Sequence, residues 1–461
     1  MSESAFDKAE PAWYQIESKE NRLFELWKKY DFLFFVPFAL AIDLLAPYLI
    51  WKHYVPSATR WVADVCIALL LVITVVRMLV RDNIPKGLLL ILSATMLWAM
   101  VATFEGQSPI ATFWGWWRMF KYPTLAVFIA LQARWPENFS QLFLKIIVGV
   151  FTFEVAFQII QFVGGQEAGD HLSGTFGRNG VGPLFFFIAF VLCLALGTWL
   201  ANGQSKLLIW VVVLGSISSG LGEMKVFPVA LISLGVIALS IHMIRGGRLR
   251  ELFLYIILFS IIAPAFVTFY NIVVAEARGT RRFEEYFELD TTETYLNNVN
   301  YNTTTGQTYL GRGFALSYGW DVIHRDVTTL LFGFGLGARG ESVSLGIVGT
   351  GLANGDYGLT TGTSLLVLMQ EFGVVGLGSL VLVMFWLVVT LFQHVKQAPD
   401  DVYNYARYAV ILYSLMWPFW LYYHKVWDFN VTMLIYWGAV GFLLSHPPKV
   451  EDMTDGGSFG N

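Results

Sequence analysis

Long apolar runs alternate along the chain with short polar connections. Each run holds roughly 20 residues, enough to cross a hydrocarbon core of roughly 30 Å as a helix. The runs lie near residues 31–51, 61–80, 86–104, 116–133, 141–163, 181–201, 206–220, 225–244, 250–274, 364–393, 402–422 and 430–446. This pattern predicts an all-α polytopic membrane protein with about 12 transmembrane helices. The tenth run is long and broken at Gly373, which predicts a short re-entrant piece followed by a full span.

Polar segments divide the chain into five parts. Residues 1–28 are polar with interleaved aromatic residues and predict a cytoplasmic or interfacial arm, since a cleavable signal places its apolar stretch directly after a short basic start. The remaining parts are transmembrane helices one to nine in 29–274, a large periplasmic loop in 275–361, helices ten to twelve in 362–446 and a cytoplasmic tail in 447–461. Trp320, several tyrosines and short apolar runs favour a folded loop.

The distribution of Lys and Arg sets the expected orientation. The group Arg245, Arg248 and Arg250 marks a cytoplasmic connection, because positive charges collect on that side of short loops. The following loop then lies outside, and both termini lie in the cytoplasm. Composition agrees, with 56% hydrophobic and only 14% charged residues, more apolar surface than a soluble domain can bury. A net charge of -4 without a basic run argues against nucleic-acid binding, and Cys66 and Cys193 lie in apolar runs, which argues against a disulfide framework or a zinc site.

Basic residues are frequent on the expected outer face. Arg118, Arg178 and Lys225 lie in or beside apolar runs with no obvious partner nearby, where charge is costly and tends to mark a site. Arg312 and Arg339 lie in the loop, where scattered charge is an equally good explanation because long loops escape the orientation rule. Guanidinium groups match phosphate bidentately, so the favoured ligand is a lipid pyrophosphate. A structural ion-pair network and an anionic sugar are the alternatives.

The loop carries two further patterns. The spacing of Leu316, Trp320 and Ile323 predicts a short helix on the membrane surface that begins near Arg312. Alternating glycines in residues 331–339 are able to bring backbone N–H groups to a phosphate. Without a strand–turn–helix context that pattern is weak, and a plain flexible turn is favoured.

Three stretches carry a likeness to one family in the expected order. Residues 173–179 read Ser-Gly-Thr-Phe-Gly-Arg-Asn and open a span. Arg312 with Trp320 is followed by the glycine-rich residues 331–337, and residues 366–377 begin the next span with Glu-Phe-Gly-Val-Val-Gly-Leu. In these motifs the chain resembles the O-antigen ligase and Wzy-type polymerase superfamily of bacterial envelope glycosyltransferases.

The resemblance implies a GT-C-like membrane domain in the bacterial inner membrane. It also implies inverting, metal-independent glycan transfer from undecaprenyl pyrophosphate to a sugar hydroxyl, without a cofactor. A polymerase that extends a lipid-linked repeat unit of an exopolysaccharide or O-antigen is favoured, working among membrane lipids and other polysaccharide assembly proteins. The ligases carry a His-Asn pair where this chain has Gly362 and Thr363, and a Ser-Arg-Gly motif where it has residues 222–225. A ligase acting on lipid A core or protein, and a lipid-linked glycan flippase or transporter, are the alternatives.

Such a transfer assigns roles to particular residues. Fixed cations stabilise the leaving pyrophosphate, whose negative charge grows in the transition state. The expected phosphate-binding residues are Arg178, Lys225 and Arg312, followed by Arg118 and Arg339.

A general base for the acceptor hydroxyl is expected among Asp356, Glu371 and His324. Glu371 alternatively pairs with an arginine, and His324 is alternatively a plain polar residue of the loop helix. Trp320 is expected to stack on a sugar or to anchor the loop at the membrane interface. The short outer segment 424–428 either closes the site or is solvated.

Overall fold

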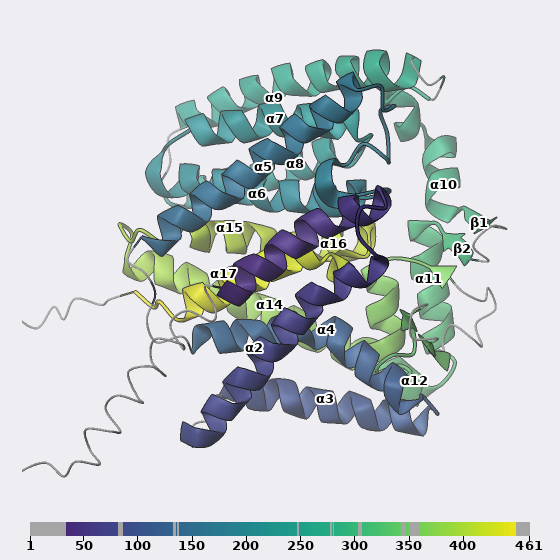
Figure 1. Cartoon of the computed structure of the whole chain (residues 1–461). Helices are drawn as coiled ribbons and strands as arrows, with labels where there is room; N and C mark the ends of the chain where they lie inside the picture. Colours follow the sequence, from purple (N-terminus) through teal and green to yellow (C-terminus); the bar gives the residue numbers. More distant parts are fainter. Residues whose placement is uncertain are drawn as a thin grey trace, which may run out of the picture.

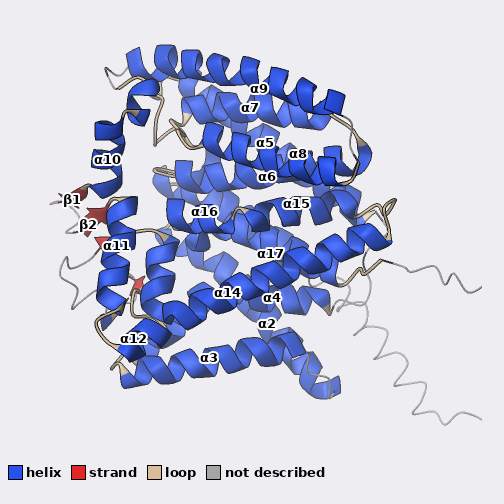
Figure 2. Ribbon diagram, turned by 180° about the vertical axis from the view of Figure 1, so that it is seen from behind, coloured by secondary structure: helices blue, strands red, loops and turns tan. Residues whose placement is uncertain are grey.

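The computed structural model describes residues 34–81, 86–131, 135, 138–246, 249–276, 279, 281–302, 307–342, 347–350 and 360–448. Long helices lie side by side in a bundle, and α10, α11, β1 and β2 cover one end of it, called the loop end below (Figures 1 and 2). Residues 1–28, most of the expected tail and Asp356 lie outside the described residues.

The bundle is formed by thirteen described helices. They are the helix Phe34–Trp51, α2 (Arg60–Arg81), α3 (Lys86–Phe104), α4 (Pro109–Ala130), α5 (Phe139–Val163), α6 (Val181–Asn202), α7 (Lys206–Leu221), α8 (Phe227–Ile244), α9 (Leu249–Tyr270), α14 (Ser364–Gln397), α15 (Asn404–Leu415), α16 (Trp417–Tyr423) and α17 (Asn430–Leu444). Short helical turns connect several of them: η1 (Ser57–Thr59), η2 (Gly174–Phe176) and η6 (Val426–Asp428).

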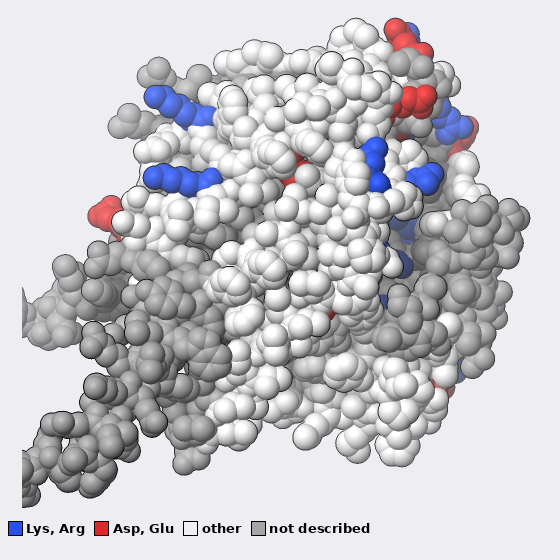
Figure 3. Space-filling model, in the orientation of Figure 1, with Lys and Arg blue, Asp and Glu red and all other residues white. Residues whose placement is uncertain are grey.

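Seven of the described helices are long and apolar enough to cross a membrane. They span Phe34–Trp51, Ser57–Val76, Lys86–Phe104, Phe139–Val163, Val181–Asn202, Phe227–Ile244 and Ser364–Gln397. On the face drawn in Figure 3, charged side chains gather toward the two ends of the bundle, and the surface between the ends is almost free of them. The predicted class, an all-α membrane protein, is confirmed. The count of about twelve spans, the orientation and the identity of the membrane stay predictions.

The core lies around α6. Almost all of its side chains are buried, because it is apolar on every face and other helices surround it. At Gly197 a Cβ would lie only 2.2 Å from the carbonyl oxygen of Tyr405 in α15. A glycine is therefore required at the closest approach of these two helices.

The described part of the long loop is folded. After η3 (Asn271–Glu276), which continues α9, it contains η4 (Glu284–Phe287), α10 (Leu289–Asn297), β1 (Val299–Asn302), β2 (Gln307–Leu310), α11 (Arg312–Ile323), α12 (Val327–Phe332), β3 (Glu341–Ser342), β4 (Ile347–Val348) and β5 (Thr360–Thr361). α11 confirms the helix predicted to begin near Arg312. In one sheet β1 pairs with β2 antiparallel and β2 with β5 in parallel. Such short polar strands leave no alternating apolar pattern, so an all-α prediction misses them.

The predicted break in the tenth run is present in α14. Gly373 has φ 60° and ψ -163°, which divides the helix into a buried first part and a longer second part. The glycine-rich segment packs against this break. Gly333, Gly335 and Gly337 have left-handed φ, and a Cβ at each would meet backbone atoms at 2.7, 2.2 and 2.1 Å, respectively. These glycines therefore serve close packing rather than a flexible turn.

Gly335→Ala is expected to lower the free energy of unfolding by about 1–3 kcal/mol, because the added methyl group meets Ala102 and the φ of +80° is unfavourable for alanine. Thermal unfolding of the purified protein in detergent measures this. Gly378→Ala is the matched control, since that glycine lies within α14 and has open space around its Cβ position. Equal midpoints for the two variants would show that the close approach is dispensable.

Candidate functional site

A fully buried carboxylate, Glu371, organises the charges near the break in α14. Its Oε1 accepts hydrogen bonds from the Arg118 guanidinium at 2.6 Å and from the backbone N–H of Arg339 at 2.9 Å. Arg118 also donates to the carbonyl oxygen of Arg339 at 3.3 Å and lies 4.0 Å from Asp428. Three residues predicted separately from the sequence, Arg118, Arg339 and Glu371, are thus brought into one cluster.

The glycine-rich segment delivers Arg339 to this cluster. Phe334 donates its N–H to the carbonyl oxygen of Gln370 at 2.7 Å, and Trp98 donates its Nε1–H to the carbonyl oxygens of Phe332 and Phe372 at 3.1 and 3.3 Å. These bonds fix the segment along the turn of α14 that carries Glu371. Because N–H groups of the segment donate within the protein, it offers a phosphate little of the backbone nest considered above.

Charge within the cluster is largely balanced. Arg118 and Arg339 face the carboxylates of Glu371 and Asp428. Burial lowers the pKa of Arg339 to about 10, so this side chain still carries its charge at neutral pH. For Arg118 the structural ion-pair network, one of the alternatives above, describes the contacts well.

A second basic group lies at the loop end. Arg312, the first residue of α11, donates from Nε to the carbonyl oxygen of Tyr423 at 2.6 Å, and its guanidinium lies 4.2 Å from the centre of the Tyr423 ring. His424 and Lys425 follow Tyr423 directly in the chain. The positive charges of Arg312 and Lys425 both act on the imidazole of His424. Burial, together with Arg312 and Lys425, lowers the pKa of His424 to about 4. The imidazole is therefore neutral at physiological pH.

The hydrogen bonds of His424 define its tautomer. Nδ1 accepts the backbone N–H of Lys425 at 2.8 Å, which leaves the proton on Nε2. Nε2 lies beside the first turn of α6, 3.1 Å from the position of a Cβ at Gly182. The carbonyl oxygen of His424 accepts the N–H of Ser364 at the start of α14 at 3.1 Å. The segment 423–428 thus links the Arg312 group to the Glu371 cluster.

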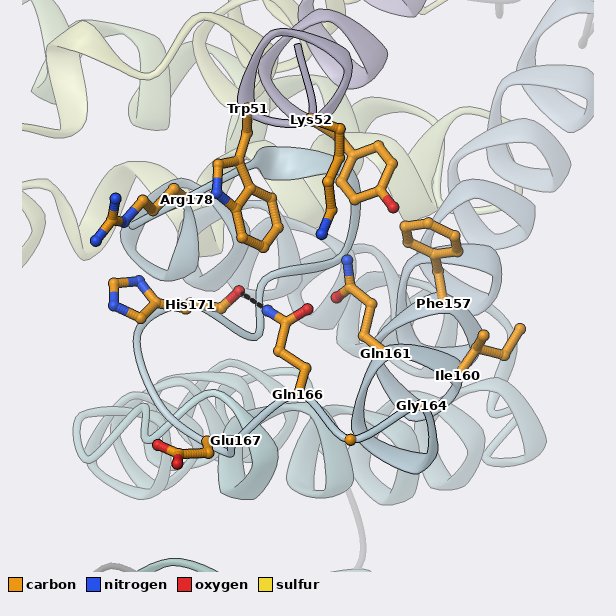
Figure 4. A pocket seen from close by; sticks show the side chains of 12 residues that line it. Trp51, Lys52, Phe157, Ile160, Gln161, Gly164, Gln166, Glu167, His171 and Arg178 are labelled. Atoms are coloured by element: carbon orange, nitrogen blue, oxygen red, sulfur yellow. Dashed lines mark hydrogen bonds between the residues drawn. The ribbon is translucent and has the colours of Figure 1, made fainter. Parts of the chain in front are cut away.

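Arg178 and Lys225 lie in two other places. Arg178 is exposed and lines a cavity of about 670 Å³ with Lys52 and His171 (Figure 4). Lys225 forms an ion pair with Glu223 at 2.9 Å, and its Nζ lies 3.9 Å from the centre of the Tyr286 ring.

The expectation that Arg118 and Lys225 lack a nearby partner is wrong. The partner of Arg118, Glu371, is 253 positions away in the sequence, and only the folded chain brings the two together. The partner of Lys225, Glu223, was visible two residues earlier. The backbone of Glu223 has a left-handed φ of 58°, which allows a turn that brings the side chains of Glu223 and Lys225 together.

The predicted general bases are not brought together. His324 is exposed and stacks on the half-exposed Trp320, with ring centres 6.1 Å apart. It follows the last turn of α11, about 18 Å from Arg312 by helical rise. Glu371 is ion-paired to Arg118, which agrees with the alternative expectation that it pairs with an arginine. Asp356 lies outside the described residues, so its role stays a prediction.

Sequence reasoning gave little weight to the segment 424–428. Arg312 acts electrostatically on His424, and Asp428 lies 4.0 Å from Arg118 of the Glu371 cluster. The available signal was a run of charged residues between two apolar runs. Thr363 accepts the N–H of Leu366 through its hydroxyl at 3.3 Å and thereby caps α14.

Comparison with known proteins gives no further assignment. No protein-family model matches the sequence, and the search of curated proteins finds no similar one.

Glu371→Ala is expected to lower the free energy of unfolding by about 3–5 kcal/mol, because it leaves the Arg118 charge and the Arg339 N–H without their acceptor. Glu371→Gln keeps an acceptor oxygen and is expected to lose less. Chemical or thermal unfolding in detergent measures both. Glu293→Ala, at an exposed position of α10, is the control and is expected to match wild type. A Glu371→Ala protein as stable as this control would contradict the organising role.

The lowered pKa of His424 predicts a pH-dependent stability. Between its ordinary pKa of 6.5 and about 4, the unfolded chain binds the proton and the folded chain does not. Stability from this group is therefore present above pH 6.5 and is lost as the pH falls toward 4, by roughly 3 kcal/mol in total. Unfolding midpoints measured between pH 7 and 4 test this. His424→Gln is expected to flatten the profile, whereas His324→Gln is expected to keep the wild-type slope.

Proposed function

We propose that the protein is a polysaccharide polymerase of the bacterial inner membrane. It would transfer a growing glycan from undecaprenyl pyrophosphate to a lipid-linked repeat unit at the outer face. The observation that carries the proposal is the group of Arg312, His424 and Lys425, held at the loop end of an apolar helical bundle. Fixed cations at the end of an apolar helical bundle fit the pyrophosphate of a lipid whose chain lies in the membrane.

Arg312 suits the stabilisation of a leaving pyrophosphate. Its guanidinium is oriented before any ligand arrives, by the Tyr423 carbonyl oxygen on one side and the Tyr423 ring beneath. A pre-oriented cation costs no rearrangement as charge develops on the leaving group, so it favours the transition state over the ground state. Lys425, which like Arg312 acts electrostatically on His424, adds a second positive charge.

Neutral His424 would act as a hydrogen-bond donor. Since Nδ1 accepts the Lys425 N–H, the Nε2–H is the group that remains to approach a phosphate oxygen. It cannot take a proton from the acceptor hydroxyl at Nε2 in this tautomer. Asp356 therefore stays the proposed general base, and no cofactor is part of the mechanism.

Two observations favour a polymerase over the alternatives. At the position of the ligase histidine, Gly362 packs against the side chain of Leu366, so no titratable group stands there. A transporter is expected to line a path through the membrane midplane with charges. Deeper in the bundle, Lys121 and Asp64 form an ion pair with each other at 2.7 Å, so their charges are not offered to a transported ligand.

The test is glycan transfer in proteoliposomes that contain an undecaprenyl-pyrophosphate repeat unit, with product length read on a gel. Wild type is expected to build a ladder, and Arg312→Ala to slow its formation by about 100- to 1,000-fold, the usual effect of removing one transition-state donor.

Arg245→Ala is the matched control. Arg245 also donates to a carbonyl oxygen, that of Leu200 at 2.8 Å, and lies over a tyrosine ring, but on the short connection that follows α8. It is expected to retain the wild-type rate. Product that forms only with a separate lipid or protein acceptor would replace the polymerase by a ligase. Lipid-linked glycan that crosses the bilayer unchanged would replace it by a transporter.

A further inference from the structure

A separate cavity opens between the C-terminal end of the helix Phe34–Trp51 and the C-terminal end of α5. Its volume of about 670 Å³ lies within the range of small-molecule sites. The segment 164–178, between α5 and α6, forms the opposite wall (Figure 4). None of the residues of the Arg312 group or the Glu371 cluster lines it.

Basic residues outnumber acidic ones in the lining of this cavity. Lys52, His171 and Arg178 come from two different parts of the chain, and Glu167 is the carboxylate among the lining residues. In Figure 4 the side chain of Lys52 points down into the space between Trp51 and Gln161, and the side chains of Arg178 and His171 lie at one side of it. A lysine that points into the space and an arginine at its side suit a phosphate, which offers several acceptor oxygens.

A further wall of the cavity is apolar and partly exposed. Phe157 and Ile160 lie one turn apart on α5, which is long and apolar enough to span a membrane. Phe157 packs edge-on against Tyr48 of the first helix with ring centres 5.1 Å apart, and Ile160 is 64% exposed. A ligand that combines an anionic head with a hydrocarbon chain would satisfy both walls. A free anion would use only one.

The walls of the cavity are tied together without a ligand. Gln161 of α5 exchanges two hydrogen bonds with the backbone of Gly174, each at 3.1 Å. Gly177 packs on the backbone of Pro47, where a Cβ would lie 2.6 Å from the carbonyl oxygen. The segment with Arg178 is thereby held against both helices, so its backbone needs little ordering when a ligand binds.

We propose that this cavity binds the phosphate headgroup of a second lipid-linked sugar, the acceptor. This role rests on the proposed function. α6 connects the two sites: Arg178 precedes its first residue by three positions, and Gly182 in its first turn packs beside His424. A donor at Arg312 and an acceptor at Arg178 would therefore lie on either side of the start of α6, with their sugars free to meet at the loop end.

The test counts bound lipid by native mass spectrometry of the full-length protein in neutral detergent, with undecaprenyl pyrophosphate as the probe. Wild type is expected to bind two molecules. The double variant Lys52→Ala, Arg178→Ala is expected to bind one, with affinity at the lost site weakened about 10- to 100-fold because two charge-assisted contacts are removed. Arg312→Ala is expected to lose the other molecule.

The matched control is Lys206→Ala, which removes a positive charge at the start of α7, a position that does not line the cavity. It is expected to bind two molecules. Unchanged binding by the double variant would overturn the proposal. If inorganic pyrophosphate bound as tightly as the lipid, the claim that the ligand needs a hydrocarbon chain would be overturned. If phosphatidylglycerol competed equally well, the acceptor role would be overturned.

Wild-type protein provides a second readout should the double variant fail to fold. A photoreactive undecaprenyl-pyrophosphate analogue is expected to cross-link to peptides that contain residues 157–178, and labelling confined to other peptides would overturn the proposal. Binding and cross-linking require no turnover. Failure here with intact polymerisation is therefore distinguishable from failure of the proposed function itself.

Discussion

The arrangement of the loop end depends on one buried carboxylate. Glu371 lies two residues before the break in α14, where desolvation of an unpaired charge would be prohibitive. One of its two oxygens, Oε1, accepts hydrogen bonds from a guanidinium of α4 and from a backbone N–H of the loop. This requirement fixes how close α4, α14 and the glycine-rich segment must approach. The left-handed glycines Gly333, Gly335 and Gly337 allow the segment to lie this close, because a Cβ at each would meet the backbone of α14, α3 or α4, respectively.

Polar residues within the bundle serve a second purpose. One turn after Arg118, Lys121 binds Asp64 of α2 at 2.7 Å and Asn430 of α17 at 3.2 Å. α4 is thus tied to its neighbours by two successive cations. Arg312 lies apart from these pairs, at the loop end beside Tyr423 and His424, where phosphate binding is proposed.

Much of the fold was readable because its physical cause is local. The break at Gly373 followed from a glycine within an overlong apolar run, and the helix after Arg312 followed from apolar spacing. The candidate site was readable only as a set of residue types. Arg118 was expected to hold a phosphate, yet its charge is met by Glu371, whose position in the sequence gives no hint of contact. The glycine pattern in residues 331–337 marks a real structural element, although its glycines serve packing.

The sequence alone determined that the chain is an all-α membrane protein, because hydrocarbon requires long apolar segments whose backbone hydrogen bonds close within each helix. It also determined which residues have the charge to bind a phosphate. Only the tertiary structure decided which of those charges are neutralised and which converge. Ion pairing depends on distances of a few ångströms between residues such as Arg118 and Glu371, and burial depends on helices packed from distant parts of the chain. Neither the ion-pair distances nor the burial follows from the local sequence.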